Sequence, residues 1–86
     1  MSLEIIPSAR FRKDLKRAIS HGYDMALLNK VVETLATEKP LPLKNRDHAL
    51  AGDYAGCREC HIASDWLLVY EIDKGGLPLV IGVIRI

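Results

Sequence analysis

The alternation of hydrophobic and polar residues changes its period along the chain. Residues 3–7, Leu-Glu-Ile-Ile-Pro, form a short apolar run that ends at a proline, which predicts a strand of about four residues. Ser8 then stands at an N-cap position, and residues 9–22 predict a helix that ends at Gly22. The apolar face of this helix carries Phe11, Leu15, Ala18 and Ile19.

A second helical pattern occupies residues 24–39, after a short turn. Asp24 begins it, and the segment Lys-Pro-Leu-Pro-Leu at its end stops it, because proline cannot continue a helix. Its apolar face carries Met25, Leu28, Val31, Val32 and Leu35. The two helices and their short connection predict a helical hairpin.

The second half of the chain predicts strands. Residues 44–56 form a polar loop rich in turn residues. Residues 57–63, 65–73 and 77–86 then predict three strands, the last of which follows a Lys-Gly-Gly turn. The order is β-α-α-β-β-β. We therefore expect one α+β domain over residues 1–86, in which a helical hairpin packs on one face of a mainly antiparallel sheet.

Composition and charge narrow the class of protein. Of the 86 residues, 49% are hydrophobic and 27% are charged, which is typical of a small globular domain and not of a disordered chain. The net charge of +1 gives no overall basic field, yet the first helix carries five cations against one acid, Asp14. The cations are Arg10, Arg12, Lys13, Lys16 and Arg17. Such a run is either a solvated helix surface or a binding face.

The chain shows neither an export signal nor an apolar run approaching the roughly 18 residues of a membrane span. We therefore expect a cytoplasmic protein with no membrane partner. Disulfides rarely persist in that compartment, and c-type haem is attached outside it in bacteria.

The spacing of Cys57, Cys60 and His61 is C-x-x-C-H, the pattern of c-type haem attachment. On a strand, however, side chains alternate, so Cys57, Glu59 and His61 share one face while Cys60 points to the other. The two cysteines then cannot hold one metal ion or form a disulfide, since both require converging side chains. We expect no haem, metal or small-molecule cofactor, and we expect Cys60 to be a small buried hydrophobic residue.

Polar residues gather on the face of this strand that is opposite to Cys60. Glu59 and His61 are two residues apart on it, and Asp65 stands at the next turn. His48 comes from the preceding loop. Two imidazoles and two carboxylates on one patch could supply an acid, a base and an orienting partner for proton transfer near neutral pH. They could equally be surface residues of a half-exposed sheet, and the spacing leaves both interpretations open.

Three spaced blocks of sequence resemble the RelE-type toxins of bacterial toxin–antitoxin systems, and specifically their YafQ branch. The blocks are D-H-x-L-x-G at residues 47–52, G-x-R-[DE]-x-H at residues 56–61 and D-W-[IL]-L-[VI]-Y at residues 65–70. The helical hairpin before them and the last strand after them also follow the family's order. The resemblance covers nearly all of the chain and implies a RelE-like fold.

This resemblance implies an mRNA interferase, a ribosome-dependent endonuclease that needs no metal. In such an enzyme the 2′-hydroxyl of the RNA attacks the adjacent phosphorus. That step requires a base, an acid and positive charge near the phosphoryl oxygens. By position, the family's active-site residues correspond to His48, Glu59, His61, Asp65 and Arg85, with Arg85 stabilising the phosphate. The family more often has Asp where this chain has Glu59.

The resemblance also implies the partners of the chain. The ribosome and mRNA would meet the five cations of the first helix together with Lys44 and Arg46 through charge pairing. A cognate antitoxin would cover the same basic helix with an acidic segment.

The family pattern continues beyond the last strand as R-x-G-[TS]-H, and that histidine is the family's principal general acid or base. The 86-residue sequence reaches only Ile86, before that histidine. We therefore expect residues 1–86 to cleave RNA weakly or not at all. Two other functions stay open: a ParE-type inhibitor of DNA gyrase, which shares the fold, and a non-catalytic module that binds the antitoxin and takes part in autorepression.

Overall fold

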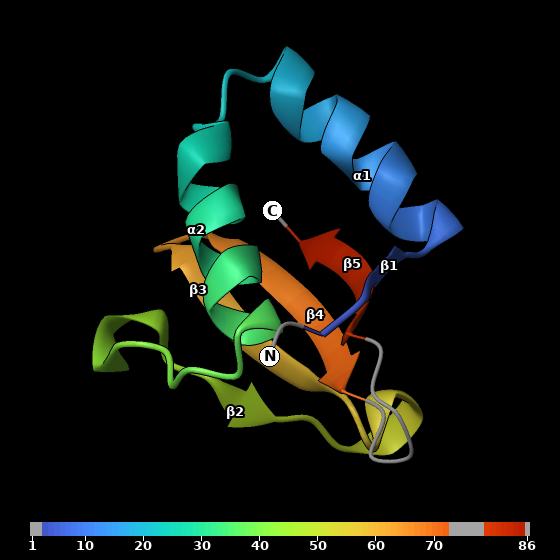
Figure 1. Cartoon of the computed structure of the whole chain (residues 1–86). Helices are drawn as coiled ribbons and strands as arrows, with labels where there is room; N and C mark the ends of the chain where they lie inside the picture. Colours follow the sequence, from blue (N-terminus) through green and yellow to red (C-terminus); the bar gives the residue numbers. More distant parts are fainter. Residues whose placement is uncertain (1–2, 73–78, 86) are drawn as a thin grey trace.

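The computed structural model describes residues 3–72 and 79–85, and its elements follow the predicted order (Figure 1). They are β1 (Ile5–Pro7), α1 (Ala9–Ser20), α2 (Met25–Ala36), β2 (His48–Ala49), β3 (Arg58–Ala63), β4 (Trp66–Ile72) and β5 (Leu79–Arg85). Two short 3-10 turns, η1 (Leu43–Asn45) and η2 (Gly52–Tyr54), flank β2. The predicted α+β fold is confirmed. The segment predicted as a loop, however, contains an additional strand, β2.

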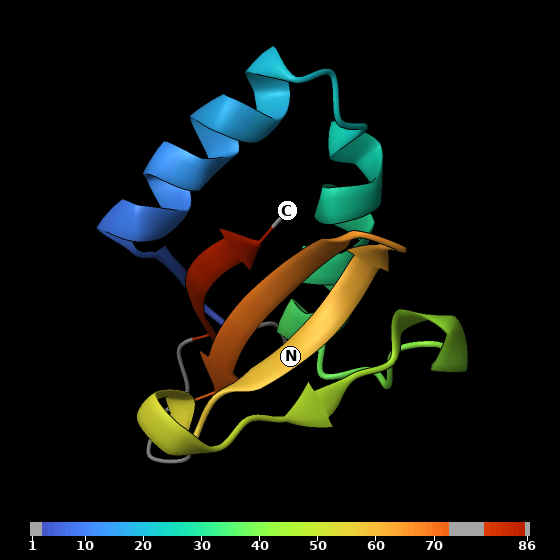
Figure 2. The ribbon, with the colours of Figure 1, turned by 180° about the vertical axis from the view of Figure 1, so that it is seen from behind.

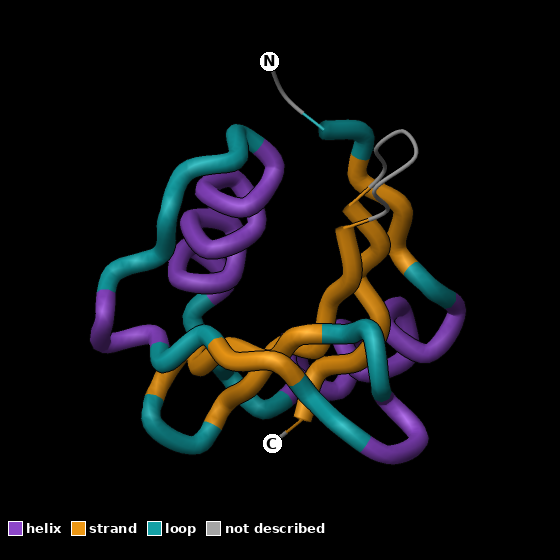
Figure 3. The backbone as a smooth tube through the Cα atoms, turned by 90° about the horizontal axis from the view of Figure 1, so that it is seen from below, coloured by secondary structure: helices purple, strands orange, loops and turns teal. Residues whose placement is uncertain are grey.

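The five strands lie in the order β1-β5-β4-β3-β2. β1 and β5 pair in parallel, and the other neighbours are antiparallel. Gly82 is an extra residue on β5, because Val69 pairs with Val83 while Tyr70 pairs with Ile81. Such a bulge increases the local twist. Figure 3 shows the strands, in orange, as one curved layer.

The helical hairpin covers one face of this sheet. Seen from behind, β3 and β4 lie in front of α2, so the sheet face toward the viewer in Figure 2 is turned away from that helix. We call this the outer face. The core lies between the two layers and is formed by Phe11, Ala18, Leu28, Val31, Leu35 and Ala36 of the helices and by Cys60, Ile62, Trp66, Leu68 and Tyr70 of the sheet.

Both helices begin where the sequence indicates. Ser8 Oγ accepts a hydrogen bond from the backbone N–H of Phe11 at 3.0 Å, and Asp24 Oδ1 accepts one from Ala26 at 2.9 Å. After α1, Gly22 adopts a φ of +79°, a conformation that glycine reaches without steric cost. Neither helix of the described residues is long and apolar enough to cross a bilayer.

Two residues of α1 differ in burial from what the predicted apolar face implies. Ile19, expected on the apolar face, is 56% exposed. Asp14, expected on the polar side, is 6% exposed, and Arg10 donates its Nε–H to Asp14 Oδ1 at 3.3 Å. Periodicity locates an apolar face along a helix, but the angle at which the helix crosses the sheet decides which flank of that face is covered.

The two cysteines occupy different environments. Cys60 is fully buried in the core, which confirms it as a small buried hydrophobic residue. Burial raises the pKa of its thiol from 9.0 to about 12. Cys57 lies before β3 and is half-buried, with its thiol 3.9 Å from Glu71 Oε2. Burial, followed by the Glu71 carboxylate, raises the pKa of the Cys57 thiol as well.

These environments predict different reactivities for the two thiols. A maleimide reagent near neutral pH should modify Cys57 slowly and leave Cys60 untouched, because the reactive thiolate of Cys60 would have to form inside the core. Mass spectrometry should therefore find a single label on the native protein and a second label only after unfolding in urea. Native protein with Cys57→Ser should take up no label. Modification of Cys60 in the native protein would contradict the assigned burial.

Candidate active site

Strand β2 brings His48 to the outer face of the sheet. His48 pairs in register with Glu59 of β3. Cys60 and Ile62 face the helices, so the alternating positions of β3, Glu59 and His61, lie on the outer face. Residues directly opposite each other in neighbouring strands share a face, and His48 therefore joins Glu59 there.

Glu59 is buried and paired with His48. Only 6% of Glu59 is exposed, and its Oε1 lies 3.3 Å from Nε2 of His48. A carboxylate at this depth keeps its charge only with partners, because burying an unpaired charge is strongly unfavourable. The observed burial contradicts the interpretation of Glu59 as a solvated surface residue.

His48 is held through both of its ring nitrogens. Nδ1 lies 2.8 Å from the carbonyl oxygen of Arg46, and since a carbonyl only accepts, Nδ1 carries the hydrogen and donates it. Nε2 faces Glu59 Oε1, and because both atoms are acceptors when unprotonated, their pairing at 3.3 Å requires a proton between them. The His48 side chain is 47% exposed, so a substrate can reach the imidazole from solvent.

His61 brings a second imidazole to the outer face. The ring centroids of His48 and His61 are 6.4 Å apart. The strand that carries His61 is held at its edge by Asn45, whose Nδ2 donates to the His61 carbonyl oxygen at 2.7 Å. Asn45 itself is buried, so η1 covers the part of this sheet edge that β2 does not. Three predicted site residues, His48, Glu59 and His61, thus lie together.

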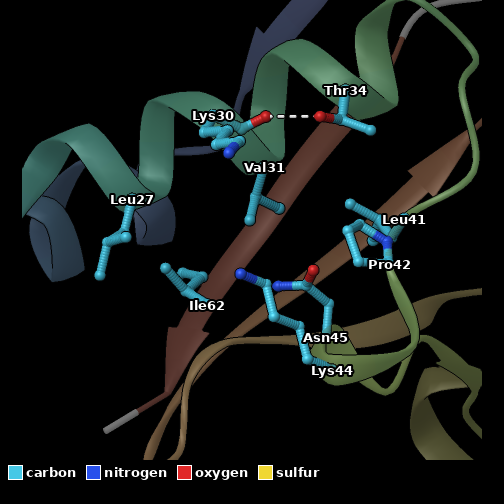
Figure 4. Close-up of a pocket in the computed structure, with 9 residues that line it drawn as sticks. All are labelled: Leu27, Lys30, Val31, Thr34, Leu41, Pro42, Lys44, Asn45 and Ile62. Carbon is cyan, nitrogen blue, oxygen red and sulfur yellow. Dashed lines mark hydrogen bonds between the residues drawn. The ribbon is translucent and has the colours of Figure 1, made fainter.

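A polar hollow of about 390 Å³ lies beside His61. Its lining includes the exposed residues Lys44 and Arg46, so two cations stand next to an imidazole. Such a grouping attracts anions. A smaller pocket of about 110 Å³ shares part of this lining and lies between α2 and β3, with Leu27, Val31 and Ile62 among its lining residues (Figure 4).

Asp65 and Arg85 are placed less completely. Asp65 lies in the exposed turn between β3 and β4. Arg85 ends β5 and pairs in register with Leu67, which in turn pairs with His61. The backbone of Arg85 is therefore two strands from His61 in one cross-strand row, while its side chain lies outside the part of the chain that the structure describes. The roles of Asp65 and Arg85 stay predictions.

The cations of α1 lie in a different layer from this cluster. α1 packs over β5, on the helix side of the sheet (Figure 1). All five are exposed, and Arg10 is paired with Asp14. The predicted RNA-binding residues are thus divided: Lys44 and Arg46 lie beside His61, whereas the cations of α1 do not.

Comparison with known proteins assigns the family. The family described as "Bacterial toxin of type II toxin-antitoxin system, YafQ" matches residues 3–86. The chain belongs to the YafQ family. The mRNA interferase toxin YafQ of Escherichia coli K12 is 35% identical over 66 residues, which are 76% of this chain and 72% of that protein.

Solved structures of YafQ and related toxins have the same fold. A metal-bound toxin from Helicobacter pylori is 46% identical and matches with a TM-score of 0.91 over 96% of this chain and 92% of that chain. A chain of the E. coli DinJ-YafQ toxin–antitoxin complex is 29% identical and matches with a TM-score of 0.87 over 99% and 92% of the two chains. The RelE-like fold expected from the YafQ motifs is confirmed.

Asp47 is a member of the site region to which sequence reasoning gave no role. In this YafQ-family chain its Oδ1 accepts hydrogen bonds from Tyr70 Oη at 2.5 Å and from Arg58 Nε at 3.2 Å. Burial, followed by the hydrogen bond to Asp47, raises the pKa of Tyr70, and the Asp47 hydrogen bond raises the pKa of Arg58. In the sequence, Asp47 is marked only by the Asp-His dipeptide of the first YafQ motif, and this motif does not indicate that Tyr70 and Arg58 contact it.

Removal of the Tyr70 hydroxyl should destabilise the fold. Tyr70→Phe is expected to lower the free energy of unfolding by about 1.5 to 3 kcal/mol, the usual contribution of a hydrogen bond to a charged group. Urea unfolding followed by circular dichroism measures the change. Tyr54→Phe is the matched control, because Tyr54 is 46% exposed, and it should have little effect.

The same hydrogen bond predicts a dependence of stability on pH. The pKa of Tyr70 is raised in the folded state above the ordinary value of 10.0, so its stabilisation is complete at neutral pH. It is lost as the pH rises above about 10, where the tyrosine of the unfolded chain ionises first. Tyr70→Phe should therefore show a weaker alkaline loss of stability than the parent chain, and equal losses would contradict this assignment.

Proposed function

We propose that this chain is a toxin that cleaves mRNA on the ribosome, with the RNA 2′-hydroxyl as nucleophile and without a metal ion. The observation that carries the proposal is the contact of His48 Nε2 with the buried carboxylate of Glu59 at 3.3 Å, beside a second imidazole. A site of this kind supplies the proton transfers that such cleavage needs. The family relationship to the E. coli mRNA interferase supports the choice of substrate.

The proposed reaction is a transesterification within the RNA. The 2′-oxygen gives its proton to a base and forms a bond to the adjacent phosphorus. The bond from phosphorus to the 5′-oxygen of the next nucleotide breaks, and this oxygen takes a proton from an acid. The products are a 2′,3′-cyclic phosphate and a 5′-hydroxyl, so the step uses no co-reactant. His48 and His61 are the two imidazoles for these transfers, with Glu59 exchanging a proton with His48.

Cations near the imidazoles would stabilise the negative charge of the transition state. Lys44 and Arg46 line the hollow beside His61, where the phosphoryl oxygens of a bound RNA would lie. By family position, Arg85 would contribute a third cation and Asp65 would complete the site. Cations already in place stabilise developing negative charge with little reorganisation at the moment of reaction.

We assign the cations of α1 to binding rather than to chemistry. They lie on the helix side of the sheet, away from His48 and His61, and so suit the backbone of ribosomal RNA. The same exposed helix suits an acidic antitoxin segment, which would compete with the ribosome. E. coli YafQ has been solved in complex with the antitoxin DinJ, which supports an antitoxin as partner of this chain.

The family's terminal histidine gives the first test of this function. Residues 1–86 should cleave mRNA weakly, whereas the chain lengthened by Gly-Thr-His after Ile86 should cleave at least about 100-fold faster, since a general acid or base contributes about 10²- to 10⁴-fold. Primer extension on mRNA bound to programmed ribosomes measures the rate. A Gly-Thr-Ala extension is the matched control and should not raise it. Equal rates for the three chains would contradict the role of this histidine.

Substitutions in the lengthened chain test the cluster itself. His61→Ala and Glu59→Ala are each expected to lower the cleavage rate by about 100-fold or more, because each removes a member of the proton-transfer path. His21→Ala removes an exposed imidazole at the C-cap of α1 and should leave cleavage unchanged. Full cleavage by both cluster variants would refute the proposed site. Inhibition of gyrase supercoiling with translation spared would instead assign the chain to the ParE type.

A further inference from the structure

The carboxylate of Asp47 is anchored on the helix side of the sheet, whereas the next side chain, His48, lies on the outer face. The two donors to Asp47 come from inner strands of the sheet, since Arg58 of β3 and Tyr70 of β4 are directly opposite each other. Tyr70 is also 2% exposed and belongs to the core. Asp47 is therefore fixed to the sheet by side-chain contacts with two strands.

Strand β2 needs such an anchor. It has only two residues, His48 and Ala49, so its ladder of backbone hydrogen bonds is short. His48 and Ala49 are both exposed, and packing does not hold them in place. The contacts of Asp47 thus restrain the chain directly before His48.

A peptide bond transmits this restraint to the His48 ring. The carbonyl that accepts the Nδ1–H of His48 belongs to Arg46, and it lies in the planar peptide unit whose nitrogen belongs to Asp47. Holding Asp47 therefore fixes the direction of that carbonyl. Arg46 also has a φ of +47°, a left-handed conformation that is unfavourable for a residue with a side chain and persists only under restraint.

We propose that Asp47, held by Tyr70 and Arg58, is a positioning residue that sets the tautomer and the place of His48. Asp47 acts through the Arg46 carbonyl, which keeps the hydrogen on Nδ1 and directs Nε2 to Glu59. Without Asp47 the Arg46 carbonyl turns away, and His48 loses both its fixed tautomer and its contact with Glu59. The proposal rests on the proposed function for its effect on cleavage, but the state of the ring is independent of any activity.

The ring state is measured by ¹⁵N NMR of histidine-labelled protein near neutral pH, in the absence of RNA. The lengthened parent chain should show the Nδ1–H form at His48. Asp47→Ala should show a mixture of tautomers, whereas Asp47→Asn should keep the parent form, because its amide oxygen still accepts from Tyr70. Asp53→Ala removes an exposed carboxylate of the same loop, in η2, and is the control that should leave the ring unchanged.

Cleavage kinetics supply the second measurement. Asp47→Ala should lower kcat by about 10- to 100-fold, the effect expected of a misplaced catalytic group, and should change KM by less than about 3-fold. Asp47→Asn should retain kcat within about 5-fold of the parent. A variant that acted only through stability would instead lose activity in proportion to its unfolded fraction, which circular dichroism measures on the same samples.

The outcomes separate this proposal from the proposed function. A folded Asp47→Ala chain with the parent tautomer and the parent kcat would overturn the positioning role. Failure of the parent chain to cleave mRNA would refute the proposed function, and the NMR comparison would still decide the role of Asp47. Where Asp47→Ala does not fold, Tyr70→Phe takes its place: a shifted tautomer population supports the proposal, and an unchanged spectrum overturns it.

Discussion

The alternation of side chains at strand β2 is the constraint on which the site depends. Asp47 must reach the helix side of the sheet for His48 to reach the outer face. A slip of one residue would exchange the two faces, removing the imidazole from Glu59 and placing a carboxylate beside a carboxylate. Because β2 is so short, the contacts of Asp47 with Tyr70 and Arg58 supplement its backbone ladder in holding this register.

The core determines the direction of the site on the neighbouring strand. Cys60 and Ile62 of β3 pack beneath the helical hairpin, so Glu59 and His61 must point the other way. This geometry divides the C-x-x-C-H residues Cys60 and His61 between the two faces of the strand. Cys60 supplies a small apolar side chain for a crowded interior, while His61, one residue on, belongs to a different face with a different task. Hydrophobic packing on one face of β3 thus directs the polar side chains of Glu59 and His61 to the other face.

The parts of the fold that follow a local period could be predicted from the sequence. Both helices, their Ser8 and Asp24 caps and the three long strands carry a clear pattern, and the motif residues His48, Glu59 and His61 do come together. β2 could not be predicted, because two residues have no period. The anchoring of Asp47 by Tyr70, 23 residues away, and the burial of Glu59 depend on contacts between strands that no local pattern encodes.

The separation of the cations into two layers has a consequence for the proposed substrate. The net charge is only +1, so attraction to RNA must come from local groups rather than from an overall field. Lys44 and Arg46 lie beside the imidazoles, whereas the cations of α1 lie behind the sheet, and exposed charges act over only about 8 Å at physiological salt. A short RNA in the site would meet the first group alone. A large, folded polyanion can meet both groups at once, and under the proposed function the ribosome with its bound mRNA is such a partner. The placement of the charges therefore suits the ribosome-bound substrate of the proposed function.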